Sequence, residues 1–172
     1  GISFGLSGAL MQTLFKNPLA DPSIIGVSAG ASAGVVIFML LGSLMPTIFI
    51  SGTFKYLSLP LSAFLGAVIT IFLIYKLATI YNKVAVTIML LAGVAINAML
   101  GALVGLFTYV STEEELKSFT FWTMGSLAHG DLKVIFTMVP VVIAIFVFAM
   151  SKNTELNLML LGEDEAKNSG VN

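Results

Sequence analysis

The sequence predicts an all-α fold, a polytopic membrane helical bundle with five transmembrane helices. Two observations carry this prediction. Hydrophobic residues make up 58% of the 172 residues and charged residues only 10%, whereas soluble domains carry about 25% charged residues. The apolar residues, which give the chain a mean hydropathy of +1.02, also form long segments between short polar breaks, and about 20 apolar residues let a helix cross a membrane.

Composition excludes several other classes of function. A formal net charge of −1 offers no basic surface for nucleic acid. The chain has no cysteine, so it forms neither a disulfide framework nor a thiolate metal site. Its single histidine, His129, lies near Asp131, but two ligands are too few for a metal site and a polar turn is the better interpretation. We therefore expect no metal, no cofactor and no catalytic residue.

Five apolar segments within residues 1–150 are the expected membrane spans. They are about residues 2–15, 24–44, 59–80, 84–110 and 133–150. The first segment is too short to cross a bilayer, so we interpret it as a span cut at its start, in a fragment of a longer polypeptide. The short link at residues 81–83 makes the third and fourth spans neighbours in a helical hairpin.

A polar break between the first two segments organises the chain. Pro18 and Pro22 cannot lie inside an uninterrupted helix, so one helix ends here and another begins. Asp21 is expected to cap the new helix, with Pro22 at its first position.

Small residues open the segment beyond the break. Gly26, Gly30 and Gly34 recur at four-residue spacing, a pattern that lets two membrane helices approach closely. Residues 26–30 also match the G-x-S-x-G of serine hydrolases. That chemistry needs a strand, a sharp turn and a helix, with a histidine base nearby, whereas the surroundings here are helical. Helix packing is therefore favoured over a nucleophile at Ser28.

The fourth segment and the polar stretch after it hold the remaining candidates. Asn97 is an amide deep in a span, and such a residue either lines a transport path or ties two helices together; the sequence leaves both open. Next, Ser111 or Thr112 is expected to cap a short acidic helix, and the aromatic residues behind it are typical of an interfacial belt. The charged residues here are candidates for binding a cation or a partner, or form a solvated run: Glu113, Glu114, Glu115 and Lys117.

Residues 151–172 are expected to be cytoplasmic, because lysines are more numerous on the side of the membrane where this tail lies. The two groups are Lys16, Lys76, Lys83, Lys152 and Lys167 against Lys55, Lys117 and Lys133. Within the tail, the apolar residues 156–161 precede Gly162 and an acidic stretch. This segment either docks into a cleft of a cytoplasmic partner or forms an interfacial helix with a polar end.

Three blocks of the sequence resemble the FecCD-type permeases of bacterial ABC importers, the group that includes the vitamin B12, haem and ferric-siderophore permeases. Residues 7–31 resemble the family form G-x-x-x-Q-x-x-x-[RK]-N-P-L-A-x-P-x-x-L-G-x-x-x-G-A, with Ile25 where leucine is usual. Residues 90–95 and 121–126 form the second block. Residues 158–171 resemble the segment L-x-L-L-G-x-x-x-A-x-x-x-G-V that contacts the ATPase.

The resemblance implies roles for two sets of residues. The family motif and helix break comprise Asn17, Pro18, Leu19, Ala20, Pro22, Gly26 and Gly30. The ATPase-coupling set comprises Leu158, Leu160, Leu161, Gly162, Glu163, Ala166 and Gly170.

The resemblance also implies an assembly and a mechanism. A whole subunit has about ten helices and pairs with a second permease subunit, as a homodimer or heterodimer, in the bacterial inner membrane. Its partners are cytoplasmic ATPase subunits and an external substrate-binding protein. The permease performs no chemistry and moves its substrate by alternating access. Asn97 becomes a candidate for the path, and the acidic stretch at 113–117 a candidate for contacting the binding protein.

Import of an iron chelate, a siderophore or haem, is the favoured function. A secondary transporter or channel independent of an ATPase is the alternative, but such proteins carry ionisable residues within their spans, and the expected spans hold no carboxylate. An intramembrane hydrolase rests on the G-x-S-x-G matches alone.

Overall fold

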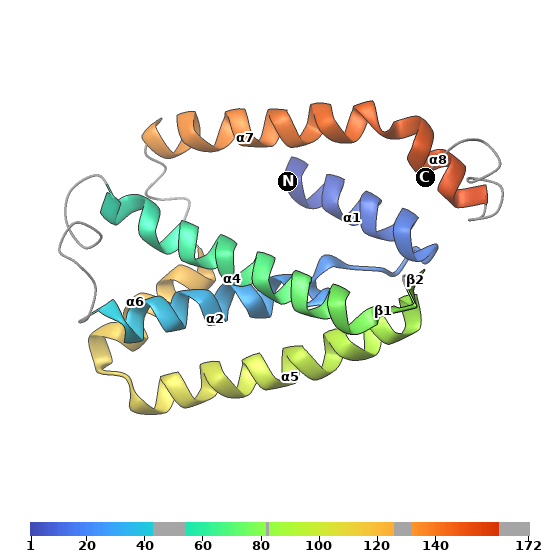
Figure 1. Cartoon of the computed structure of the whole chain (residues 1–172). Helices are drawn as coiled ribbons and strands as arrows, with labels where there is room; N and C mark the ends of the chain where they lie inside the picture. Colours follow the sequence, from blue (N-terminus) through green and yellow to red (C-terminus); the bar gives the residue numbers. More distant parts are fainter. Residues whose placement is uncertain (43–53, 82, 126–131, 162–172) are drawn as a thin grey trace. The chain divides into compact units, whose positions relative to one another are not determined.

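A computed structural model describes residues 1–42, 54–81, 83–125 and 132–161. These residues form helices and one small β-hairpin (Figure 1). They fall into two compact units, one containing Gly1–Pro22 together with the chain after residue 125, the other Ser23–Gly125. The all-α prediction is confirmed.

The described residues of the first unit form three helices. They are α1 (Ile2–Phe15), α7 (Leu132–Ser151) and α8 (Asn153–Leu161), and α1 contacts both of the others. Helix α1 ends at Phe15 and is capped by Lys16, which adopts a left-handed conformation with φ of 48° and donates its backbone N–H to the carbonyls of Gln12 and Thr13. This cap satisfies carbonyls that a helix end leaves without partners.

The second unit is built on α2 (Val27–Leu40), α4 (Phe54–Ala78), α5 (Val86–Val110) and α6 (Glu113–Met124), entered through the 3₁₀ turn η1 (Pro22–Ile25). Helix α2 packs against both α4 and α5. Figure 1 shows α4 and α5 as the two long arms of a hairpin, with α6 at the end away from their connection.

The connection between α4 and α5 is a β-hairpin. Strands β1 (Thr79–Ile80) and β2 (Lys83–Val84) pair antiparallel, with Thr79 opposite Val84. The N–H of Ala85 donates to the carbonyl of Ala78 over 2.9 Å, so the pairing also occupies the last carbonyl of α4. The predicted helical hairpin is confirmed, but helix α4 ends at Ala78 because residues 79–80 and 83–84 form this ladder instead of extending either helix.

Helix α4 also begins earlier than the expected start at residue 59. It starts at Phe54 and contains Pro60. A proline inside a helix removes one backbone hydrogen bond and bends the helix without necessarily ending it. The expected start at about residue 59 is therefore too late, because Pro60 lies inside the helix and not at its beginning.

A hydrophobic cluster joins α6 to α2 and α5. Val35, Val36, Phe107 and Phe119 are buried together. The rings of Phe107 and Phe119 meet edge to face, with centroids 5.6 Å apart, a favoured arrangement of aromatic pairs. The short acidic helix and the aromatic residues behind it are thus one helix, and Phe119 belongs to a protein core rather than to an interfacial belt.

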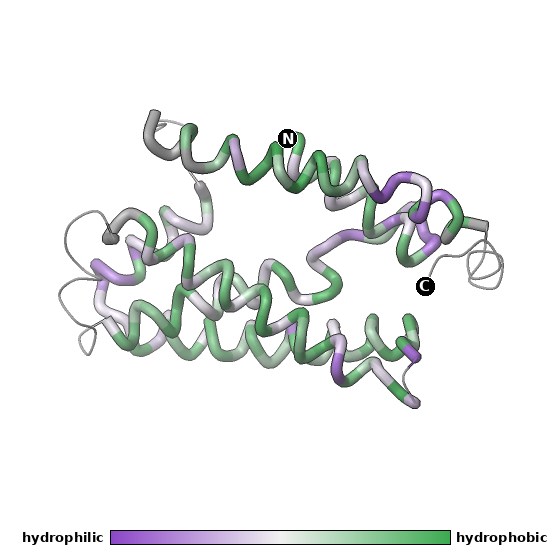
Figure 2. The backbone as a smooth tube through the Cα atoms, turned by 45° about the horizontal axis from the view of Figure 1, so that its top comes forward, coloured by the Kyte–Doolittle hydropathy of each residue, from purple (hydrophilic) through white to green (hydrophobic). Residues whose placement is uncertain are grey.

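Two helices of the described chain are long and apolar enough to cross a membrane. They are Leu57–Ala78 and Val86–Val110. The other expected spans correspond to shorter apolar helices, Ile2–Phe15, Val27–Leu40 and Met138–Ser151. Figure 2 shows hydrophobic residues along most of each helix and the strongly hydrophilic ones mainly near helix ends. Large side chains such as Phe64 and Leu91 are 65% and 66% exposed, a surface that requires lipid or further helices to cover it.

Candidate functional site at the helix break

Helices α2 and α4 meet backbone to backbone. A Cβ on Gly30 would lie 2.8 Å from the carbonyl oxygen of Gly66, and one on Gly34 would overlap the carbonyl of Ser62. Conversely, a Cβ on Gly66 would overlap the carbonyl of Gly30. The close approach predicted for this glycine pattern is therefore confirmed at Gly30 and Gly34, with Gly66 as the partner that the sequence reasoning missed.

Gly26 forms the break itself. It has φ of +80° and separates the 3₁₀ turn η1 from α2, without a side-chain cap. A Cβ at this position would lie 2.7 Å from Cγ2 of Thr70 and 3.0 Å from Cδ1 of Ile74, both on α4. Glycine is required here both by the left-handed backbone and by the space. Pro22 does open the first turn, as expected, but α2 proper begins only at Val27.

Ser28 lies in the first turn of α2, preceded by η1. A nucleophile elbow places its serine between a strand and a helix, and the structure has a 3₁₀ turn where that strand would be. The hydrolase interpretation thus loses its structural support. His129, the candidate base, lies outside the described residues.

Asn97 reaches the break from α5. Its Nδ2 donates to the carbonyl of Ser23 over 3.0 Å and to that of Ile24 over 3.4 Å. One helical turn earlier, a Cβ on Gly93 would overlap the carbonyl of Ile24. Of the two roles left open by the sequence, these bonds support the tie between segments; the role in a transport path stays a prediction.

The family-motif residues before the break form a compact turn in the first unit. The N–H of Leu19 donates to Oδ1 of Asn17 over 2.9 Å, and the N–H of Ala20 to the Asn17 carbonyl over 3.0 Å. Such side-chain bonding to the backbone two residues on is a common use of asparagine in turns. Ala20 is buried, whereas Leu19 is 83% exposed.

Helix α1, the turn that follows it and helix α8 line a cleft of about 410 Å³. Its lining comprises Ala9, Gln12, Thr13, Lys16, Asn17, Pro18 and Leu160. Leu160, from the expected coupling segment, is 51% exposed, and Leu158 is half-buried. Leu161 ends α8, while Gly162, Glu163, Ala166 and Gly170 lie outside the described residues.

The acidic stretch begins α6 with a capping box. The N–H of Thr112 donates to Oε2 of Glu115 over 3.0 Å, and the N–H of Glu115 donates to Oγ1 of Thr112 over 3.4 Å. The backbone bond and then the side-chain bond from Thr112 lower the pKa of Glu115 below its ordinary value. Thr112 is thus the cap, and Glu115 serves the helix end, while Glu113 and Glu114 remain exposed.

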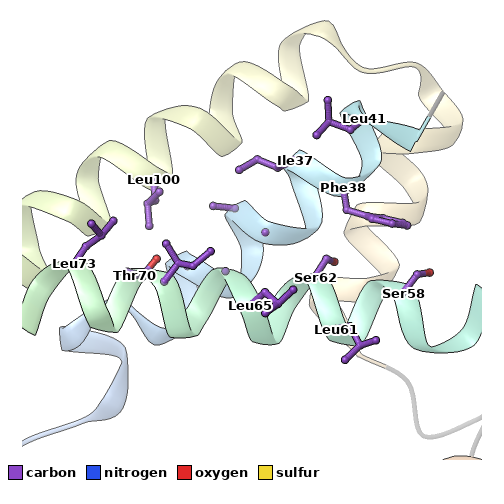
Figure 3. A pocket seen from close by; sticks show the side chains of 15 residues that line it. Ile37, Phe38, Leu41, Ser58, Leu61, Ser62, Leu65, Thr70, Leu73 and Leu100 are labelled. Carbon is purple, nitrogen blue, oxygen red and sulfur yellow. The ribbon is translucent and has the colours of Figure 1, made fainter. Parts of the chain in front are cut away.

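An apolar groove of about 510 Å³ runs along α2 and α4 (Figure 3). Figure 3 shows Ile37 and Phe38 projecting from α2, Leu65 from α4 and Leu100 from α5. Its lining among the described residues contains no charged side chain. Within the described part of the chain, no group of three or more potential ligands could hold a metal ion.

Long apolar helices with uncovered hydrophobic faces, joined backbone to backbone through glycines, define a polytopic helical membrane protein. The chain belongs to the FecCD transport family, whose model matches residues 1–172. The family resemblance seen in the three sequence blocks is thereby confirmed.

Individual relatives are similar over nearly all of this chain. The hemin transport system permease protein HmuU of Yersinia pestis is 33% identical over 172 residues, which cover 100% of this chain and 50% of that protein. The cobalamin import system permease protein BtuC of Halobacterium salinarum is 34% identical over 171 residues, 99% of this chain and 43% of that protein.

A solved structure is similar as well. A metal-chelate type ABC transporter in an inward-facing conformation matches with a TM-score of 0.80 and 32% identity, over 99% of this chain and 51% of the solved chain. The chain therefore spans about half the length of the relatives that it matches.

Proposed function

We propose that this chain is part of the membrane permease of an ATP-driven, binding-protein-dependent importer, and that the cargo is an iron chelate, a siderophore or haem. The family match over residues 1–172 carries the proposal. The similarity to a hemin permease and to a metal-chelate type transporter supports a chelate as cargo, and the similarity to a cobalamin permease makes cobalamin the competing cargo.

The permease acts by alternating access in the bacterial inner membrane, without chemistry on its cargo. ATP-driven closure of cytoplasmic ATPase subunits is transmitted through α8 and the residues after it, and a second permease subunit completes the path. Exposed Leu160 on α8 suits a docking contact. On the opposite side of the membrane, Glu113, Glu114 and Lys117 are proposed to contact the binding protein, because their side chains are exposed on α6.

Uptake into proteoliposomes tests the proposal. The full-length permease is reconstituted with its ATPase subunits, the binding protein is added outside, and labelled haem, ferric siderophore and cobalamin are compared. The proposal expects uptake of an iron chelate only with ATP and the binding protein. Preference for cobalamin would overturn the choice of cargo.

A secondary transporter remains the alternative class. Ion coupling relies on ionisable residues within the spans, and the two long apolar helices, Leu57–Ala78 and Val86–Val110, contain one charged residue, Lys76 in the last turn of α4. Uptake driven by an ion gradient without the ATPase would establish this alternative.

A further inference from the structure

The contact between α5 and the break uses two successive turns of the helix. At the first turn, the missing side chain of Gly93 lets the carbonyl of Ile24 lie against the helix backbone. At the second, Asn97 donates to Ser23 and Ile24. Residues four apart lie on the same face of a helix, so Gly93 supplies the space and Asn97 the hydrogen bonds for one contact.

The orientation of the Asn97 amide follows from its partners. Backbone carbonyls only accept hydrogen bonds, so the NH₂ end must face Ser23 and Ile24. The Oδ1 end is buried and has no hydrogen-bond partner among the described residues. It lies 3.4 Å from the position that a Cβ of Gly26 would occupy, so the amide is enclosed between α5 and the break.

The two ends of the Asn97 amide contribute differently to this contact. The NH₂ end adds a second donor to the Ser23 carbonyl, which also accepts from the N–H of Gly26 over 3.1 Å, and a donor to the Ile24 carbonyl. The Oδ1 atom, which has no hydrogen-bond partner among the described residues, lowers the stability of the contact, because a buried acceptor has lost its bonds to water. Asn97 therefore holds the break to α5 through its NH₂ donors, and its oxygen adds no hydrogen bond to this contact among the described residues.

We infer that Asn97 is a positioning residue that clamps the break at Ser23–Gly26 to α5, so that the two segments move together during the transport cycle. The inference rests on the proposed function. Without the amide donors, α5 moves without carrying the break, and ATP hydrolysis continues with less cargo moved per cycle. A residue of the transport path would instead change the affinity for the cargo.

The test uses the full-length permease with its ATPase and binding protein in proteoliposomes. Asn97→Leu removes both donors at similar size, Asn97→Asp removes them at the same shape, and Asn97→Gln keeps them. Met99→Leu is the matched control, because Met99 lies on a different face of α5 and is 71% exposed. The readouts are cargo moved per ATP hydrolysed and the backbone hydrogen exchange of residues 23–30.

Asn97→Leu and Asn97→Asp should lower the amount of cargo moved per ATP hydrolysed about fivefold, the size of effect that the loss of one buried hydrogen-bonded contact produces. Both variants should also speed backbone hydrogen exchange at residues 23–30. Asn97→Gln should restore part of both effects, and Met99→Leu should change neither readout.

An unchanged ratio of cargo to ATP together with unchanged exchange would overturn the clamp. A raised KM for cargo at an unchanged ratio would also overturn it and would assign Asn97 to the transport path. Failure of the Leu and Asp variants to assemble, with Asn97→Gln active, would also overturn it by showing a folding role. If wild type shows no ATP-dependent uptake, the proposed function fails, while the exchange measurement still decides whether the clamp exists.

Discussion

Replacing Gly66 by alanine is predicted to force α2 and α4 apart. The new Cβ would overlap the carbonyl oxygen of Gly30 and lie 2.8 Å from Cα and 3.0 Å from N of Gly34. All three are backbone atoms, so no side chain can rotate to make room. The helices themselves must separate, and the contacts along their shared face weaken.

The magnitude follows from two opposing effects. Overpacking of a tight interface costs up to about 3 kcal/mol, and here the backbone contact places the cost at that upper end. Alanine is more favourable than glycine within a helix by about 1 kcal/mol. The net loss in free energy of unfolding is therefore about 2 kcal/mol.

Denaturant titration of the full-length permease in detergent measures this loss. Gly101→Ala is the matched control, because no atom of the described residues lies within 4 Å of its Cβ position on α5; it should leave stability unchanged or raise it by about 1 kcal/mol. If Gly66→Ala proved as stable as Gly101→Ala, the backbone-to-backbone packing of α2 on α4 would be refuted.

Three further predictions concern the break and α6. Gly26→Ala should destabilise the permease by about 2 kcal/mol, since it adds strain at φ of +80° to a clash with Thr70; wild-type stability in the same titration would contradict it. Thr112→Val should cost about 0.5 kcal/mol at the helix start, seen as faster hydrogen exchange in the first turn of α6. Because bonding to Thr112 lowers the pKa of Glu115 from its ordinary 4.5, its contribution is present above pH 4.5 and lost as the pH falls through the lowered value; exchange in that turn should rise over that window in wild type but not in Glu115→Gln.

Sequence reasoning succeeded where the signal was local. Prolines and glycines act on their own backbone, so the break at Pro18–Pro22 and the close-packing face of Gly30 and Gly34 were foreseen from the sequence. A short acidic helix capped by Ser111 or Thr112 was also predicted, because a cap lies next to the helix start in the sequence; the structure identifies Thr112 as the cap.

What the sequence did not reveal depends on contacts distant along the chain. Asn97 bonds to a carbonyl 74 residues away, and no local pattern names that partner. Gly66 was passed over because a single glycine in an apolar helix shows no sign of what approaches it, and the stripe of small residues that contains Gly93 did not identify Ile24 as its contact. The strands at 79–80 and 83–84 have two residues each, too short for an alternating pattern. Phe119 is buried against Phe107, a contact that the local sequence does not indicate.

Capture of the ATPase partner decides whether this chain belongs to an ATP-driven permease. The full-length permease is purified together with its candidate ATPase, as wild type and as a Gly162→Pro, Ala166→Asp double variant, with membrane insertion checked for both. Wild type is expected to retain the ATPase, and the double variant is expected to lose it. Equal retention by both would show that the segment after α8 is not the docking site, and no retention by either would contradict an ATP-driven permease.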